Sequence, residues 1–365
     1  QRSISFGGVA TDKASALTFT QLTDVVMSSD APVQVTVHRW NDTDPQDNPD
    51  SLTAPYATTI TAKGDVKKSI AGHWAADITL TGEGATKETL KTFKAQSLSD
   101  SVFQITGAIG TFDVSKGKVE EFTLNVDGDA KTIKLGDVSN SSLTAQDIAT
   151  LQAFRMIGGQ ITADTIKTFK ITGDKKTAIA GDMNASLTIN GDPAAKTVLG
   201  TATIVGLLGG QWQVEGPVGS ITAGDVDAFT GNVVGAVSAF SSKAAFSGLL
   251  AAFSFAKIDI KTNMIDAKFI AGGDSASSFI NSLKIGGNMT NSSIFVGVNA
   301  INGIFGDEDD LLLGGASHLI KSLTIGGVTD TGNPMFFAGL FPQTATINKV
   351  KVDPLMDPRF TITPV

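Results

Sequence analysis

The chain has 365 residues, a formal net charge of −8 and no cysteine. The negative charge argues against a nucleic-acid partner, since phosphate binding requires basic patches, and the lack of cysteine excludes disulfides and thiolate metal sites. Charged residues make up only 18% of the chain, so Thr, Ser, Asn and Gly must cover much of the surface. This composition favours a secreted β protein, and no apolar run has the length of a membrane span.

Residues 1–60 differ from the rest of the chain and are predicted to form an N-terminal β cap. Val33, Val35 and Val37 alternate with polar residues, which indicates a strand with one buried face. An acidic loop containing prolines follows over residues 41–50. The first coil of a solenoid exposes a strand edge, and a cap would shield that edge.

Residues 61–352 contain many short apolar strands separated by Gly, Asp and Asn, which predicts a β-solenoid with insertions. Helical periodicity is weak, and Ala145–Phe154 is the best helical candidate. Residues 353–365 contain three prolines and are predicted to form a C-terminal tail, since proline removes the donors that a β-ladder needs.

A six-residue phrase recurs along this region, with the pattern apolar, any, small or polar, apolar, any, apolar. It occurs at Leu90–Ala95, Ile109–Val114, Val119–Leu124, Ile166–Ile171, Val218–Ala223, Phe255–Ile260, Ile280–Ile285, Ile320–Ile325 and Ile347–Val352, with a weaker copy at Leu151–Met156. Such recurrence indicates a repeat unit whose apolar positions face a common core.

The phrase is clearest in Ile280–Gly297, which is predicted to be a strand, a corner at Gly286-Gly287 and a second strand. A second phrase begins with Gly and Asp or Asn and ends with Ser. It occurs at Gly64–Ser69, Gly181–Ser186 and Gly287–Ser292, which predicts equivalent corners in which Asp182 and Asn288 stack.

The predicted fold is an all-β parallel β-solenoid. Strands this short cannot bury a core in one sheet, whereas stacked coils cover each other's apolar faces and satisfy the backbone hydrogen bonds. The alternative is a tandem β-sandwich, which also has short strands with turn signals between them.

Two acidic loops are candidate calcium sites, because calcium binds about six to eight oxygen ligands. The stronger candidate has the possible ligands Asn299, Asn302, Asp307, Asp309 and Asp310. The weaker candidate has Asp42, Asp44 and Asp47, with Asp50 at the end of the same loop, which prolines stiffen. The alternative in both cases is a solvated acidic loop without a metal.

No catalytic or cofactor-binding residue is assigned. His38, His73 and His318 lack the spacing of a metalloprotease motif, and neither a nucleophile elbow nor a P-loop is present. Trp40, Trp74, Trp212 and Tyr56 are dispersed, which favours structural packing over a sugar-stacking surface.

The repeat at Ile280–Gly297, together with Ile320–Gly327, resembles the β-helical repeat regions of large secreted and cell-surface proteins of planctomycete-type bacteria. The resemblance is clear over residues 250–352 and loose over residues 61–250. It implies an extracellular, right-handed parallel β-helix with a structural or surface role, and it implies no catalytic residues.

The hypothesis from sequence is therefore a non-enzymatic extracellular structural protein, a self-assembling surface-layer, filament or matrix subunit for which calcium is a candidate stabilising ion. Its expected partners are further copies of itself, with polysaccharide as another candidate. The alternatives are a polysaccharide-binding or polysaccharide-lyase-like β-helix, and an adhesin stalk. No signal peptide is visible in the chain, which starts at Gln1, so secretion is an expectation from the composition and the repeats.

Overall fold

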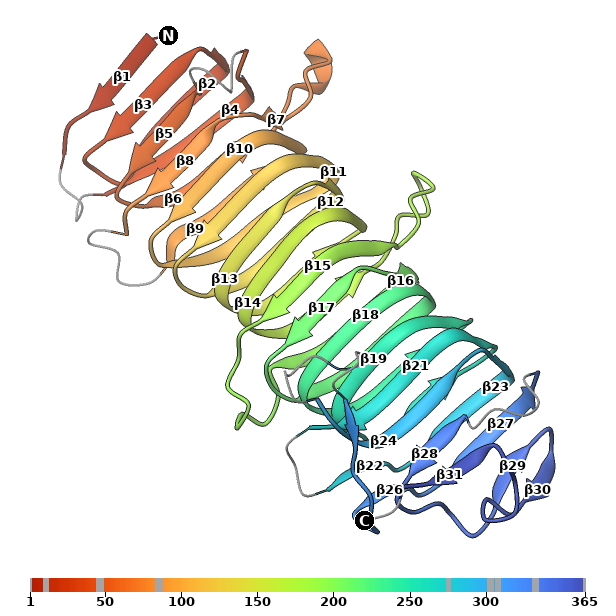
Figure 1. Ribbon diagram of the computed structural model, residues 1–365. Coiled ribbons are helices and arrows are strands. Elements are labelled where there is room, and N and C mark those ends of the chain that lie inside the picture. The colour runs from red at the N-terminus through yellow and green to blue at the C-terminus, as the bar shows by residue number, and fades with distance from the viewer. Residues whose placement is uncertain are drawn as a thin grey trace. The chain divides into compact units, whose positions relative to one another are not determined.

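A computed structural model of the chain describes residues 2–8, 13–43, 49–82, 88–273, 277–300, 305, 310–329 and 335–363. These residues form β-strands and one short 3-10 helix, without any α-helix. The chain divides into two compact units, residues 1–180 and residues 181–365. In each unit the strands pair in parallel from coil to coil (Figure 1), which confirms the predicted parallel β-solenoid.

The first unit contains β1 (Arg2–Phe6), β2 (Ser15–Thr23), β3 (Val25–Ser29), β4 (Val33–Asn41), β5 (Ser51–Ala54), β6 (Ala57–Ala62), η1 (Val66–Lys68), β7 (His73–Trp74), β8 (Asp77–Leu80), β9 (Glu88–Ala95), β10 (Ser97–Ile105), β11 (Ala108–Val126), β12 (Ala130–Ser139), β13 (Ser142–Ala153) and β14 (Arg155–Ile171).

The second unit contains β15 (Met183–Ile189), β16 (Leu199–Leu208), β17 (Gln211–Val214), β18 (Val218–Ser242), β19 (Phe246–Phe255), β20 (Ile258–Ile260), β21 (Met264–Gly272), β22 (Ser278–Ile280), β23 (Leu283–Thr290), β24 (Ser293–Asn299), β25 (Leu311–Leu312), β26 (His318–Ile320), β27 (Leu323–Val328), β28 (Phe336–Ala338), β29 (Ala345–Ile347), β30 (Val350–Val352) and β31 (Phe360–Ile362).

Three stacks of parallel strands form the wall of the first unit. Face A consists of β1, β3, β5 and β8, followed by segments of β10, β11, β13 and β14. Face B consists of β2, β4, β6 and β9, followed by segments of β11, β12, β13 and β14. Face C consists of shorter segments, including β7 and the middle of β11. A long strand therefore runs through more than one face.

The corner from face C to face A is made by residues with left-handed backbone angles. These are Asp24 (φ 55°), Asp100 (φ 46°), Glu121 (φ 51°) and Asn140 (φ 48°). Asp and Asn tolerate this conformation better than most other side chains. After two of these corners, Ser101 and Ser141 donate a hydrogen bond to the carbonyl two residues earlier, at 2.7 and 2.8 Å. These local bonds support the corner in two of the coils, on either side of the coil that contains Glu121.

Apolar side chains stack in columns inside the coils. One column of face B contains the buried residues Val35, Ile60, Phe93, Phe112, Ile133, Leu151 and Phe169. The rings of Phe93 and Phe112 are stacked, with centroids 4.7 Å apart. Because each fully buried side chain contributes about 1.5–3 kcal/mol, these columns are the main source of stability.

The repeat phrase predicts these columns correctly. In Leu90–Ala95, Ile109–Val114 and Ile166–Ile171 the first, fourth and sixth residues are buried on face B. In the second unit, the copies at Phe255–Ile260, Ile280–Ile285 and Ile320–Ile325 are in mutual register. Parallel pairing excludes the alternative of tandem β-sandwiches, and only β24–β25 and β29–β30 are antiparallel among the described strand pairs.

Several local predictions are wrong. Ala145–Phe154 lies mostly in strand β13 instead of a helix. Ile347–Val352 spans an antiparallel hairpin, in which Val350 is exposed. Gly286 and Gly287 lie within β23 and have no positive φ; a Cβ on Gly286 would approach the carbonyl oxygen of Lys261 to 2.2 Å. The chain turns later, at Asn291 (φ 46°).

The three copies of the second phrase, which begins with Gly and ends with Ser, do not share one structure. Met183 and Met289 belong to one column of the second unit, so Asp182 and Asn288 occupy equivalent places. Four other coils separate them in that column, so the predicted stacking of Asp182 on Asn288 is wrong. Gly64–Ser69, in contrast, lies in a hairpin that protrudes after β6 (Figure 1). A similar hairpin follows β14 at residues 172–180, and each one is closed by an antiparallel bridge.

Both ends of the chain contribute strands to the solenoid. Residues 1–60, assigned to a cap, supply β1 to β5 and most of β6, whose pairing is parallel like that of later coils. In the C-terminal tail, β31 pairs in parallel with β28. The function of residues 1–60 as a cap stays a prediction.

Candidate functional site

Three aspartates of the first unit come together beside the corner between β2 and β3. Asp24 occupies the left-handed corner, Asp42 follows β4, and Asp50 precedes β5. One carboxylate oxygen from each of them lies within 4.8 Å of the others. Asp24 is exposed, Asp42 is half-buried and Asp50 is fully buried. This aspartate triad could hold a metal ion, because closely spaced carboxylates repel each other unless a cation or protein donors compensate them.

Protein donors hold the triad in place. The Val25 N–H and the Trp40 indole N–H donate to the two carboxylate oxygens of Asp50, at 2.6 and 2.9 Å. The Asp50 N–H donates to the Asp42 carboxylate at 2.7 Å, and the Thr43 hydroxyl donates to Asp24 at 2.6 Å. Asp50 therefore has a structural role of its own, and a metal ion would add to an arrangement that is already ordered.

A fourth carboxylate lies on the next coil. Ser51 of β5 is in register with Asp77 of β8, whose carboxylate accepts the Val102 N–H at 2.8 Å. Burial raises the pKa of Asp77 and the negative charge of Asp42 raises it further, while the Val102 N–H opposes the shift. The raised pKa of Asp77 therefore reflects mainly its burial, with a smaller contribution from the charge of Asp42.

The two predicted calcium loops are only partly within the described residues. Of the stronger set, Asn299 is half-buried at the end of β24 and pairs with Leu311, and Asp310 is half-buried. Asn302, Asp307 and Asp309 lie outside the described residues, as do Asp44 and Asp47 of the weaker set. Of the residues named for the two loops, Asp42 and Asp50 belong to the triad.

Phe305, which follows β24, packs against the sheet of the second unit. Phe305 is buried and packs with Ala251, Ile270, Val298 and Ala300. Ala251 and Ile270 are in register on β19 and β21. The Phe305 side chain thus covers apolar residues of these two strands.

The histidines and tryptophans belong to the packing of the coils. Trp40 and Trp74 are fully buried with ring centroids 4.7 Å apart, and Trp212 is buried, so the preference for structural packing is confirmed. The His73 ring lies 2.9 Å from the Ser97 hydroxyl. Burial lowers the pKa of His73 and the positive charge of Arg39 lowers it further, so this histidine favours the neutral form. The buried His318 ring lies 3.0 Å from the Ser278 hydroxyl.

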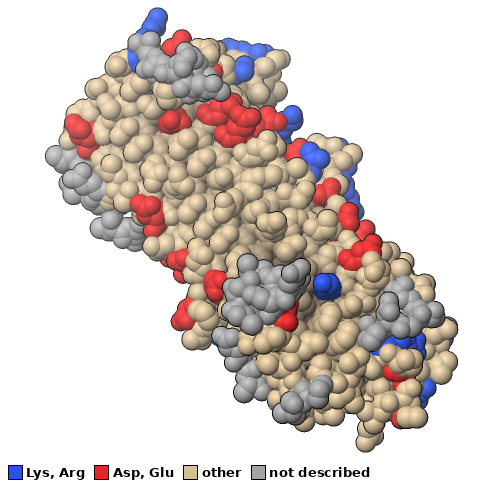
Figure 2. All heavy atoms as spheres, viewed as in Figure 1, with Lys and Arg blue, Asp and Glu red and all other residues tan. Residues whose placement is uncertain are grey.

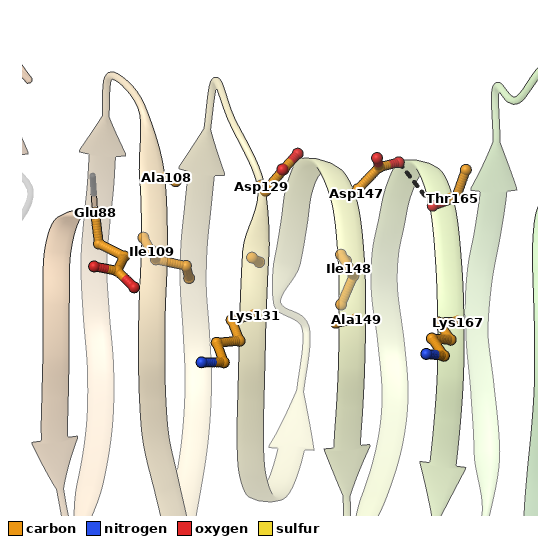
Figure 3. A pocket seen from close by; sticks show the side chains of 11 residues that line it. Glu88, Ala108, Ile109, Asp129, Lys131, Asp147, Ile148, Ala149, Thr165 and Lys167 are labelled. Carbon is orange, nitrogen blue, oxygen red and sulfur yellow. Dashed lines mark hydrogen bonds between the residues drawn. The ribbon is translucent and has the colours of Figure 1, made fainter. Parts of the chain in front are cut away.

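Face B carries a cavity of about 410 Å³ (Figure 3). Its lining combines small and apolar residues with charged ones, namely Glu88, Ala108, Ile109, Asp129, Ala130, Lys131, Asp147, Ile148, Ala149, Thr165 and Lys167. Asp129 and Asp147 lie near the beginning of their coil segments, and Lys131 and Lys167 lie farther along the same face. Thr165 donates a hydrogen bond to Asp147 at 2.7 Å. This cavity, which we call the groove on face B, suits a ligand that presents both apolar surface and charge.

Asp24 and the groove on face B were not predicted from the sequence. Asp24 is separated from Asp42 and Asp50 in sequence and meets them only because the coils stack. The sequence does contain a signal for the corner that Asp24 occupies. Asp24 stands directly before the buried Val25, just as Asn140, at another corner, stands directly before the buried Ser141.

Among the described residues, no helix has the length and apolar character needed to cross a membrane. Comparison of the chain with protein-family models, with curated proteins and with solved structures gave no match.

Proposed function

We propose that this protein is a non-enzymatic extracellular structural protein, whose copies assemble side by side into a surface layer, filament or matrix. The observation that carries the proposal is the chemistry of face A. One outward column runs over eight successive coils through Ser5, Ser28, Thr53, Thr79, Gln104, Asn125, Thr144 and Thr162. Every one of these side chains is uncharged and at least partly exposed.

The neighbouring outward column of face A is also nearly free of charge. It contains Ser3, Val26, Ser51, Asp77, Val102, Thr123, Ser142 and Gln160. Figure 2 shows mostly uncharged surface over this part of the first unit. In a chain with a net charge of −8, such a face lets two copies approach without direct repulsion.

Hydrogen bonds within face A keep its side chains in fixed positions. The Asn125 amide donates to Gln104 at 3.2 Å, and the hydroxyls of Ser5 and Ser28 lie 3.0 Å apart. Side chains that already hold one another in place lose less conformational entropy when the face is covered. This favours packing of face A against face A of a second copy.

Calcium at the aspartate triad is part of this proposal. Bound calcium would compensate the charges of Asp24, Asp42 and Asp50 and would stabilise the first coils. The resemblance of the repeats to surface proteins of planctomycete-type bacteria supports an extracellular location.

Sedimentation and negative-stain imaging of the purified chain, with and without calcium, test the proposal. Ordered filaments or sheets are expected from the wild type, and Thr144→Lys should abolish them by placing charge on face A. Gln152→Lys, an equal change of charge on face B, should leave them intact. A chain that stays monomeric in every salt and calcium condition contradicts the proposal.

A further inference from the structure

Face B of the first unit carries the same four-residue pattern on alternate coils. Strands β9, β12 and β14 present Lys-Thr-apolar-Lys, at residues 91–94, 131–134 and 167–170. In each copy the apolar residue is buried and both lysines are exposed. We call the six lysines of these copies the lysine face: Lys91, Lys94, Lys131, Lys134, Lys167 and Lys170. Their repetition follows from the register of the coils and is not apparent from their spacing in sequence.

The coils in between keep the central threonine and apolar residue of this pattern but have other residues in place of the two lysines. At the corresponding positions β11 has Gly110 and Asp113, and β13 has Ala149 and Gln152. Neighbouring strands lie about 4.7–4.9 Å apart, so pairs of lysines recur about every 9.5 Å along the stack. An unbroken ladder of threonines runs between the two lysine columns, formed by Thr92, Thr111, Thr132, Thr150 and Thr168.

The ammonium groups of the lysine face are available to an external anion. Within the described residues, none of the six forms an ion pair. Asp113 is in register with Lys94 and Lys134, but its carboxylate accepts hydrogen bonds from the N–H and hydroxyl of Ser115, at 3.1 and 2.6 Å. Other carboxylates, those of Glu88, Asp129 and Asp147, border the face at the beginning of its strand segments.

Small residues between the lysines open a groove. Ala149 separates Lys131 from Lys167, because it lies on the intervening coil. The resulting cavity of about 410 Å³ has an apolar floor that includes Ala108 and Ile148. A sugar ring fits this combination, since its C–H surface packs on apolar side chains while its acidic group pairs with a lysine.

We propose that the lysine face binds a linear anionic polysaccharide, carrying carboxylate or sulfate groups, that lies along the stack of coils. Acidic sugars pair with the lysines of β9, β12 and β14, and uncharged sugars lie over the small residues of the intervening coils. Threonine hydroxyls donate hydrogen bonds to sugar oxygens along the ladder. The site is separate from face A, so it does not depend on the assembly proposed above.

Charge density favours a polysaccharide over nucleic acid. Duplex DNA carries one phosphate per about 1.7 Å, which calls for dense basic patches. Lysine pairs about 9.5 Å apart, bordered by carboxylates on a chain of net charge −8, match a sparsely charged polymer better.

Isothermal titration of the full chain tests this proposal with polygalacturonate as the carboxylated probe, dextran sulfate as the sulfated probe and neutral dextran as the control. We expect binding to at least one anionic polymer, none to dextran, and weaker binding as salt increases. Lys131→Thr/Lys134→Thr should weaken that binding by about tenfold. Lys131→Arg/Lys134→Arg should retain it, because the charge is kept.

Lys196→Thr/Lys243→Thr is the matched control, since it removes two exposed lysines from the second unit. It should leave binding within about twofold of wild type, and circular dichroism verifies the fold of each variant. If Lys131→Thr/Lys134→Thr and Lys196→Thr/Lys243→Thr lose equal amounts of polysaccharide affinity, the effect of charge is non-specific and the proposal is overturned. It would also be overturned if neither anionic polymer bound, or if DNA or anionic vesicles bound more tightly than both.

Discussion

The indole N–H of Trp40 donates a hydrogen bond of 2.9 Å to the fully buried carboxylate of Asp50. The other oxygen of the same carboxylate accepts the Val25 N–H at 2.6 Å. One acidic side chain thus joins the end of β4 to the beginning of β3, across adjacent coils of the first unit.

Asp50→Ala should lower the free energy of unfolding by about 2–4 kcal/mol, because it leaves two buried donors without an acceptor. Asp50→Asn is the matched control, since it keeps one acceptor oxygen and should cost less. Urea denaturation with EDTA present measures both effects without a contribution from metal. Equal costs for the two variants would show that the hydrogen bonds of Asp50 are not the cause.

Calcium should raise the unfolding temperature of the wild type. A ligand that binds only the folded state, at about 100 times its Kd, adds about 2.7 kcal/mol of stability. Asp24→Asn/Asp42→Asn should abolish this increase in the unfolding temperature. Each asparagine keeps one side-chain oxygen, which can still accept the hydrogen bond from Thr43 or from the Asp50 N–H. Differential scanning fluorimetry with calcium, magnesium and EDTA measures the increase. An undiminished calcium effect in the double variant would place the ion elsewhere in the chain.

The acid sensitivity of the second unit should depend on Asp259. Burial raises the pKa of this carboxylate, but the hydrogen bond and charge of Lys261, at 2.7 Å, together with the charge of Lys257, outweigh burial and lower it. A lowered pKa in the folded state stabilises the protein above the unfolded-state pKa, and this stabilisation is lost as the pH falls through the folded-state pKa.

Asp259→Asn should therefore destabilise the protein by about 1 kcal/mol near neutral pH, given the exposure of both lysines. The difference from wild type should vanish at pH values well below 3.8, the ordinary value for Asp. Denaturation curves across this range provide the measurement. A constant difference at all pH values would mean that packing, and not charge, accounts for the effect.

Much of the solenoid could be predicted, because the repeat phrase records which positions face the core. Ala130–Leu135 was not recognised as a copy of the phrase, because Ala130 is a weak apolar signal although it is buried. Gly286 was misinterpreted, because glycine serves both for left-handed angles and for close backbone approach, and only the second applies there.

The candidate functional surfaces could not be predicted in the same way. The meeting of Asp24 with Asp50 and the alternation of Lys131 with Ala149 both depend on register between coils. Coil lengths vary along the chain, so residues that share a column have no constant spacing in sequence. Only the register of the paired strands in the structure shows which residues share a column.

The apolar columns predict large effects of truncation. Phe112→Ala should cost about 3–5 kcal/mol, since the ring is fully buried and stacks on Phe93. Thr111→Ala, at the adjacent half-buried position of face B, is the control and should cost less than about 1 kcal/mol. Chemical denaturation compares the two, and similar costs would contradict the assignment of inward and outward positions.

The most direct test of assembly through face A uses the absence of cysteine from the chain. Thr144→Cys places a single thiol on face A, and Gln152→Cys places one on face B. After mild oxidation of assembled protein, the account predicts disulfide-linked dimers from Thr144→Cys and few from Gln152→Cys. Equal cross-linking of the two variants, or dimers from Gln152→Cys alone, would contradict packing of face A against face A.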